Sequence, residues 1–235
     1  MKKFFYIVVF TLFVFALQAQ KDSSEFNIYK YKPTPSDRLV LEVNHTGWLG
    51  VKNELREAMT SGGVNFMLFF DHPIASSHFS FAWGGSISSY NIHGPIDIVY
   101  KTDSATRAVQ YTALVKRTAP YNINRIGLKI LEVPVEFRFR SWTDYQFKLS
   151  IGFKVGYVVQ SFRKIYDSNA KVKIFDIEGI NPWRYGVTLR MGWEQLHVTA
   201  FYSLSEFFLN GKGTPGVIPF SIGLAYTPRI SLGGR

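Results

Sequence analysis

Apolar and polar residues alternate with a period of two along most of the chain beyond residue 38. The alternation is strong in 127–140, 146–160, 183–193 and 218–226, and weaker in 39–51, 64–71, 77–90 and 196–206. A period of two places every second side chain on the same face of a β-strand. Helical periodicity is nearly absent, because the best window, from Lys52 to Thr60, is short and has a poor apolar face. The pattern therefore predicts eight β-strands.

The connections between these stretches alternate between long and short. In chain order they span 52–62, 72–76, 93–124, 141–145, 162–180, a few residues near Glu194, and 209–215. Barrels of the bacterial outer membrane have short periplasmic turns, longer outer loops and an even number of antiparallel strands. The sequence thus predicts an all-β fold, an eight-stranded antiparallel up-and-down transmembrane β-barrel over residues 39–228, with both termini on the periplasmic side.

A soluble eight-stranded barrel, such as a periplasmic carrier of the lipocalin type, is the alternative fold. It turns its apolar face inward, whereas a membrane barrel turns that face toward lipid. Two tryptophans favour the membrane barrel. Trp183 and Trp193 share one face ten residues apart, and a tilted strand of that length rises about 25 Å, the height of the apolar band. We expect both to be interfacial aromatics.

The polar face of the predicted strands carries many charges. Eight strands enclose a lumen that side chains fill, and charges confined in such a space need partners. We therefore predict a structural ladder of lumen charges formed by Glu132, Glu136, Arg138, Arg140, Lys148, Lys154, Arg184 and Arg190. A ladder of this kind argues against a general diffusion pore.

The beginning of the chain has the features of an export signal. Lys2 and Lys3 precede an uncharged run at 4–17, and Ala19 offers a small residue for cleavage. The run falls short of the roughly 20 residues that a spanning helix needs. We expect a signal peptide at 1–19 rather than a membrane anchor. A periplasmic lead-in at 20–38, a short C-terminal tail at 229–235 and a location in the cell outer membrane complete the prediction.

The overall charge is basic, with 27 Lys and Arg against 17 Asp and Glu, a net charge of +10, and no cysteine. The missing cysteines exclude disulfides and Cys-ligated metal sites. Nucleic acid is not an expected partner of an exported chain without a groove-reading motif. We expect cations of the outer loops to face the phosphates of an anionic outer leaflet that includes lipopolysaccharide. These cations are Lys116, Arg117, Arg163, Lys164, Lys171 and Lys173.

Candidate catalytic residues are few. His78 and His197 fall on the inner face, but on strands that are not neighbours in the predicted order. His93 and Asp97 lie in the long connection 93–124 without a nucleophile or a third orienting group, so a solvated pair is the simpler interpretation. No metal-ligand spacing and no Gly-rich phosphate loop occurs in the sequence. We expect no enzymatic activity, no cofactor and no metal site.

Proline interrupts the most regular of the predicted strands. Pro134 lacks a backbone N–H, and a closed barrel has no free edge where that loss is harmless, so we expect a β-bulge there. The pair Gly84 and Gly85 also falls within a strand pattern, where glycine marks a bend or a close approach in the barrel wall.

Six segments of the chain form a recognisable set. They are SDRLVLEVNHTGWLG at 36–50, SGGVNFMLFFDHPI at 61–74, HFSFAWGGSISSYNIH at 78–93, ILEVPVEFRFRS at 130–141, FKLSIGFKVGYVVQS at 147–161 and RYGVTLRMGWEQLHVTAFYSLSEFF at 184–208. Together they resemble the PorT family of outer-membrane β-barrel proteins, and LEVPVEFRFR and FKVGYVVQS carry the most specific part of the likeness. In that family, the strand that corresponds to 130–141 has the same Val-Pro step as Val133-Pro134 in this chain.

The resemblance implies a non-enzymatic accessory role in the type IX secretion system. That system carries proteins with a C-terminal sorting domain across the outer membrane and supports gliding motility or surface protease display. Implied partners are other secretion-system proteins of the outer membrane or periplasm, and the family supplies no catalytic residues to carry over. The alternative function is an independent surface or ligand-binding barrel that uses the long connections 93–124 and 162–180 as its binding site.

Overall fold

The computed structural model describes residues 38–228, except 76, 142–145 and 168–170. All of these residues belong to one compact unit, Thr34–Arg235. The expected signal peptide at 1–19, all of the lead-in at 20–38 except Arg38, and the tail at 229–235 lie outside the described residues. No helix among the described residues is long and apolar enough to cross a membrane.

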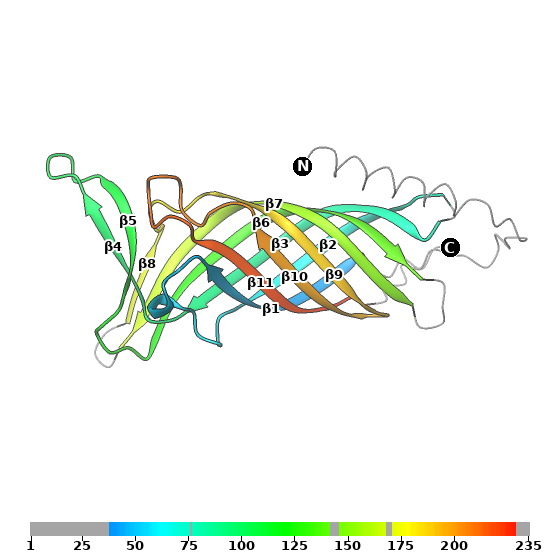
Figure 1. Ribbon diagram of the computed structural model, residues 1–235, viewed down its shortest axis with the longest axis horizontal. Helices are drawn as coiled ribbons and strands as arrows, with labels where there is room; N and C mark the ends of the chain where they lie inside the picture. Colours follow the sequence, from blue (N-terminus) through cyan, green and yellow to red (C-terminus); the bar gives the residue numbers. More distant parts are fainter. Residues whose placement is uncertain (1–37, 76, 142–145, 168–170, 229–235) are drawn as a thin grey trace, which may run out of the picture. The chain divides into compact units, whose positions relative to one another are not determined.

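Eight strands close into a ring in which each strand pairs with the next one along the chain (Figure 1). Every pairing is antiparallel, and the first and last strands close the ring. Closure satisfies the backbone N–H and C=O groups without leaving a sheet edge in the wall. The eight-stranded antiparallel barrel is therefore confirmed. Its strands are β1 (Leu39–Leu49), β2 (Gly62–Pro73), β3 (Phe79–His93), β6 (Ile123–Arg140), β7 (Phe147–Tyr166), β9 (Trp183–Trp193), β10 (Leu196–Ser203) and β11 (Ile218–Tyr226).

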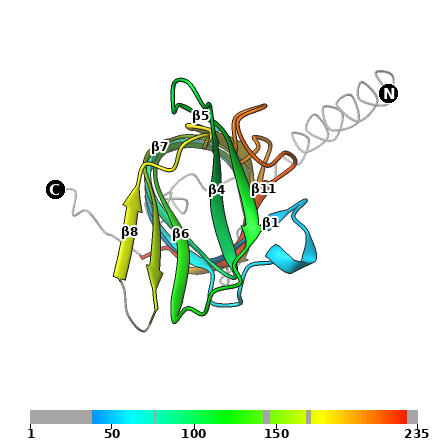
Figure 2. The ribbon, with the colours of Figure 1, turned by 90° about the vertical axis from the view of Figure 1, so that its left-hand side faces the viewer.

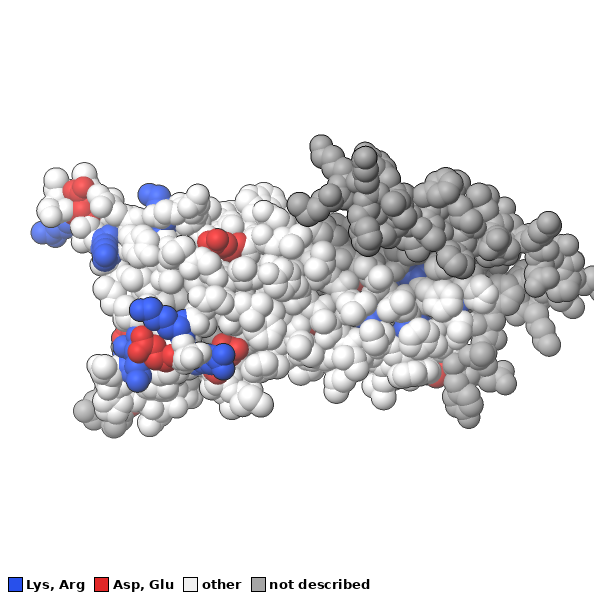
Figure 3. Space-filling model, in the orientation of Figure 1, with Lys and Arg blue, Asp and Glu red and all other residues white. Residues whose placement is uncertain are grey.

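The apolar face of these strands points outward. On β7, Ile151 and Val159 are 59% and 51% exposed, whereas Lys154 between them is 4% exposed. Much of the wall in view in Figure 3 is uncharged. Most of the Lys, Arg, Asp and Glu in view lie at the end that carries the long connections, and a few more are visible toward the other end. A soluble barrel has the opposite arrangement, so the predicted orientation toward lipid is confirmed.

Two of the long connections contain β-structure where the sequence predicted only loops. The connection between β3 and β6 folds into a hairpin of β4 (Ile96–Thr102) and β5 (Val109–Lys116). β7 runs on to Tyr166, and β8 (Lys171–Phe175) pairs with its last five residues. A 3-10 turn, η2 (Asn53–Leu55), lies between β1 and β2. These short elements lie beyond the apolar wall, so their alternation is mixed with surface charges and was missed.

The expected β-bulge at Pro134 is wrong. Pro134 pairs in register with Lys154 of β7, and the register shift between β6 and β7 occurs at Lys129/Ile130 instead. On its other side, the ladder with β3 pairs Trp83 with Val135 and Ser86 with Glu132, but makes no pairs at Gly84 and Gly85. The missing N–H of the proline is thus accommodated by a gap in the ladder rather than by an extra residue.

Candidate functional site

The lumen is the first candidate site, because eight charged side chains from β6, β7 and β9 point into it. The structure buries all eight residues of the predicted ladder, with exposed fractions between 1% and 6%. The three strands are neighbours in the ring, so these charges lie on one side of the lumen wall. Opposite them lie polar residues of β1, β2 and β3, which include Asn44, Asn65 and Ser88.

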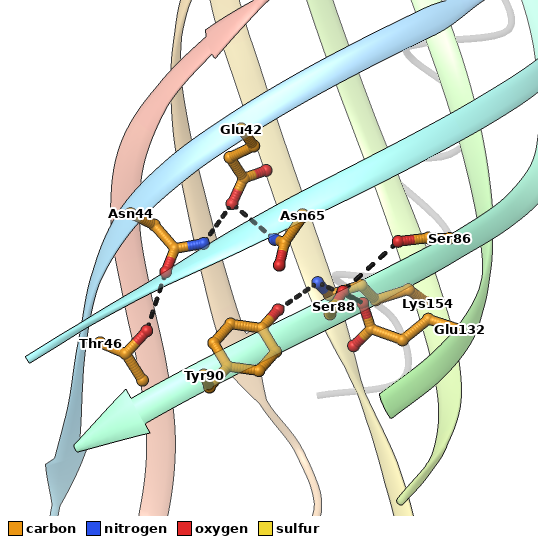
Figure 4. Close-up of polar contacts among 9 residues, drawn as sticks. All are labelled: Glu42, Asn44, Thr46, Asn65, Ser86, Ser88, Tyr90, Glu132 and Lys154. Carbon is orange, nitrogen blue, oxygen red and sulfur yellow. Dashed lines mark hydrogen bonds and ion pairs between the residues drawn. The ribbon is translucent and has the colours of Figure 1, made fainter. Parts of the chain in front are cut away.

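Glu132 and Lys154 form the centre of one polar cluster (Figure 4). Lys154 Nζ lies 3.1 Å from Glu132 Oε2 and donates a second hydrogen bond to the hydroxyl of Tyr90 at 3.1 Å. Ser88 donates to the same carboxylate oxygen at 2.5 Å. The carboxylate and the ammonium group therefore have partners from three strands, which is what a buried ion pair requires.

A second cluster in Figure 4 belongs to the opposite wall. Glu42 Oε1 accepts hydrogen bonds from Asn44 Nδ2 at 2.7 Å and Asn65 Nδ2 at 2.9 Å. Thr46 continues the chain by donating to Asn44 Oδ1 at 2.8 Å. The hydrogen bonds to this carboxylate come from two side-chain amides.

The third cluster lies toward the periplasmic end, around Glu136 and Asp71. Glu136 Oε2 accepts from Arg138 Nε at 2.8 Å and from Arg190 at 2.6 Å. Asp71 of β2 pairs with Arg138 at 3.7 Å and with Arg140. Arg138 therefore connects two carboxylates on different strands. Lys148 lies opposite Arg140 in the register, so the two cations are adjacent at this rim.

Aromatic rings supply further partners for the cations. Arg184 lies 4.2 Å from the ring centroid of Tyr90 and 4.6 Å from that of Phe201, and Lys154 approaches the Phe201 ring to 4.5 Å. Arg138 lies 4.3 Å from the Phe69 ring. Attraction between a cation and a ring face is stronger in a desolvated site, so these rings stabilise an excess of buried positive charge.

Two glycines of β7 make room for the glutamates. Gly152 lies opposite Glu136 and Gly156 opposite Glu132 in the register. A Cβ at either glycine would come within 3 Å of the glutamate Cγ, at 2.9 Å and 2.7 Å. The small residues thus set the space in which the carboxylates lie, and little space remains. A cavity beside Glu136 and Lys154 measures about 20 Å³, which is close to the volume that holds a single water molecule.

The outer end of the lumen is covered by an apolar cluster and by the β4–β5 hairpin. Figure 2 looks onto this end and shows the hairpin crossing the opening of the ring. Thr112 of β5 donates its backbone N–H to the Lys212 carbonyl at 2.9 Å and its hydroxyl to the Glu178 carbonyl at 2.8 Å. The cluster beneath contains Trp48, Leu55, Tyr90, Ile92, Ile96, Ile98, Leu114, Ile126, Leu128, Ile130, Ile177, Phe207, Phe208 and Val217.

The pair of His93 and Asp97 does not form a catalytic arrangement. The Asp97 carboxylate binds Arg117 at 3.1 Å and Arg163 at 2.6 Å. Burial, and secondarily the charge of Arg125, lower the pKa of His93 below its ordinary value. Arg163 is 7% exposed, so the expectation that Arg117 and Arg163 face outer-leaflet phosphates is wrong, because both turn toward Asp97.

The structure also brings in residues that the sequence did not single out. Glu42, Asp71 and Tyr90 complete the lumen clusters together with Phe69 and Phe201. The phase of the alternation in β1, β2, β3 and β10 places these side chains inward, but the pattern there is weaker, and which residue meets which depends on the register and packing of the strands. No group of three or more His, Asp or Glu in the described ranges could hold a metal ion.

Trp183 and Trp193 lie at the two ends of β9 and point outward, 53% and 63% exposed. Trp183 contacts Tyr157 edge-on with ring centroids 5.3 Å apart, and Trp193 packs beside Phe147 at 5.5 Å. Aromatic residues therefore occur in pairs at both heights where a girdle is expected.

Comparison with known proteins agrees with this geometry. The family model described as "Outer membrane protein beta-barrel domain" matches residues 23–221. The chain belongs to this family. The outer-membrane barrel therefore has its location in the cell outer membrane, with the wide apolar wall in lipid and the charged lumen shielded from it. No curated protein and no solved structure matches the barrel significantly.

Proposed function

We propose that this outer-membrane barrel is a non-enzymatic component or assembly factor of the type IX secretion system. The observation that carries the proposal is the filled lumen. Buried charged side chains fill the lumen around a cavity of about 20 Å³, and β4 and β5 cross its mouth, which argues against passage of a polypeptide. Cargo must then cross elsewhere, and the barrel acts through its surfaces.

The choice of secretion system rests on the likeness of the segments at 130–141 and 147–161 to the PorT family. Those segments contain the second part of β6 and the first part of β7, which supply six of the eight lumen charges. The most specific part of the likeness, LEVPVEFRFR and FKVGYVVQS, contains five of the eight lumen charges. Partners are other secretion-system proteins of the outer membrane or periplasm.

Deletion of the gene tests the proposal. We expect sorting-domain cargo to accumulate in the periplasm and to disappear from the cell surface and medium, as measured by immunoblotting of the fractions. Expression of the full chain should restore export. The wild-type protein must first be shown to reach the outer membrane. Unchanged cargo export in the deletion strain would then refute the secretion role.

The second candidate function is an independent surface barrel that binds a ligand with its outer connections. The folded β4–β5 hairpin and the β7–β8 extension favour it, because they present ordered backbone beyond the membrane. The same deletion strain separates the two functions. Normal export together with loss of a surface-binding phenotype in variants that lack the hairpin would favour the ligand-binding barrel.

A further inference from the structure

Five basic side chains gather on the outward face of β6, β7 and β8, beyond the apolar wall. They are Arg125 and Lys129 of β6, Lys164 of β7, and Lys171 and Lys173 of β8. The register places them next to one another, since Arg125 pairs with Lys164 and Lys164 pairs with Lys173. We call these five residues the basic patch.

Aromatic rings lie between the cations of the basic patch. Lys164 Nζ lies 4.2 Å from the centroid of the Tyr166 ring, and Lys171 Nζ lies 5.6 Å from it. Lys173 approaches the rings of Phe162 and Phe175 to 4.8 Å and 4.3 Å. A hydrogen bond from Lys164, and then the charges around it, lower the pKa of Tyr166 below its ordinary value.

Within 38–228, apart from the gaps in the description, the basic patch has no salt bridge to an acidic residue. The salt bridges among the described residues use other cations, and none reaches any of the five. The acids nearest in sequence, Asp167 and Asp176, stand at the ends of the β7–β8 pair. Cations held this close repel one another, and an anion of the surroundings would relieve the repulsion.

The height of the basic patch above the membrane indicates which anion it meets. Tyr157 and Trp183 mark the outer interface, and Leu131 pairs with Tyr157. From Leu131, Lys129 lies about 5 Å and Arg125 about 15 Å further out along a tilted strand. The wall directly below is exposed and apolar, with Leu131 51% and Val133 56% exposed. The cations therefore begin at the level of the lipid headgroups and face sideways.

We propose that the basic patch binds the phosphate groups of the phosphorylated glycolipid of the outer leaflet, while the wall below packs against its acyl chains. Lysine and arginine bind phosphate through charge-assisted hydrogen bonds. Continuity with the lipid-facing wall favours a lipid over a protein ligand. This inference rests on membership of the outer-membrane family and is independent of the secretion role.

Two variants, each with four substitutions, test the proposal. Both lose four positive charges, so they have the same net charge. The patch variant is Arg125→Gln, Lys164→Gln, Lys171→Gln and Lys173→Gln. The control variant is Lys52→Gln, Lys101→Gln, Arg107→Gln and Lys212→Gln, which removes four exposed cations of the hairpin and of the β1–β2 and β10–β11 connections. Each full-length protein is folded into phosphatidylcholine vesicles with bisphosphorylated lipid A or its dephosphorylated form, and lipid A retained after purification is measured by native mass spectrometry.

We expect lipid A affinity in the patch variant to fall by roughly fivefold for each charge removed, with little change in the control. Dephosphorylated lipid A should bind both variants equally weakly. Equal losses in both variants, or equal retention of both lipids, would overturn the proposal. Binding of an acidic peptide that depends on the patch, with lipid A retention unchanged, would also overturn it. If the fourfold variant does not fold by heat-dependent gel mobility, the single variants Lys164→Gln and Lys173→Gln give the same comparison.

Discussion

Individual charged residues in the lumen matter through their partners rather than through exposure to solvent. Glu132 meets Lys154 and Ser88, and Glu136 meets Arg138 and Arg190. An ion pair in a dry site contributes little net stability compared with apolar residues, but the removal of one partner leaves an uncompensated charge. Single substitutions in the lumen clusters are therefore expected to be costly.

Substitution of Glu132 tests this balance. We expect Glu132→Gln to lower the free energy of unfolding by about 3 to 5 kcal/mol, because Lys154 loses its buried counter-charge. Urea unfolding of the vesicle-inserted barrel, followed by tryptophan fluorescence, measures the change. Glu54→Gln in η2, where the side chain is exposed, is the matched control and should stay within about 0.5 kcal/mol. Equal effects of the two substitutions would contradict the ion-pair interpretation.

At the scale of the elements, small residues allow neighbouring strands to approach each other closely. The adjacent glycines of β3 differ in what surrounds them. A Cβ at Gly84 would lie within 2 Å of the Leu68 carbonyl oxygen of β2, at 1.8 Å, whereas Gly85 has nothing within 4 Å. Only Gly84 is thus required for the close approach of β2 and β3, in agreement with one of the two expected roles of the pair.

Alanine at each glycine tests this difference. Gly84→Ala should cost about 1 to 3 kcal/mol of unfolding free energy, since the backbone of β2 must shift. Gly85→Ala adds a methyl group on the lipid side and should leave the stability unchanged or slightly raised. The two midpoints of urea unfolding give the comparison. A loss at Gly85 as large as that at Gly84 would show that both glycines serve the bend of the strand.

On the scale of the whole molecule, the barrel is closed both around its circumference and at its outer mouth. Backbone pairing from β1 to β11 makes the ring, and the contacts of Thr112 with Lys212 and Glu178 fasten the hairpin over the opening. These contacts join residues about 100 and 66 positions apart in sequence. The hairpin, together with the apolar cluster beneath it, therefore limits access to the lumen from outside.

Cysteine labelling measures that access, because the chain has no cysteine of its own. A single Ser88→Cys in the lumen, where the side chain is fully buried, should react slowly with a water-soluble maleimide. Replacement of residues 97–115 by a short Gly-Ser linker should speed the reaction. Met59→Cys, at a position 92% exposed, should react rapidly in both proteins. Rapid labelling of Ser88→Cys in the intact chain would contradict the closed mouth.

Much of the architecture follows from local pattern alone. A period of two and alternating connection lengths determine the number of strands, their antiparallel order and the inner position of residues such as Glu136 and Arg190, because strand pleat is a local property of the backbone. The same reasoning misplaced the bulge at Pro134, since the accommodation of a missing N–H depends on the neighbouring strand, where Gly84 and Gly85 happen to lie.

Tertiary structure alone decided which charges meet and what covers the lumen. The register of the β6–β7 hairpin already brings Lys154 beside Glu132. Asp71 joins Arg138, and Arg163 turns to Asp97, only because the tertiary structure brings separate segments together. The β4–β5 hairpin over the lumen and the clustering of the basic patch likewise depend on the tertiary structure. Alternation assigns a side chain to a face, whereas the partner across that face is fixed by the three-dimensional path of other strands.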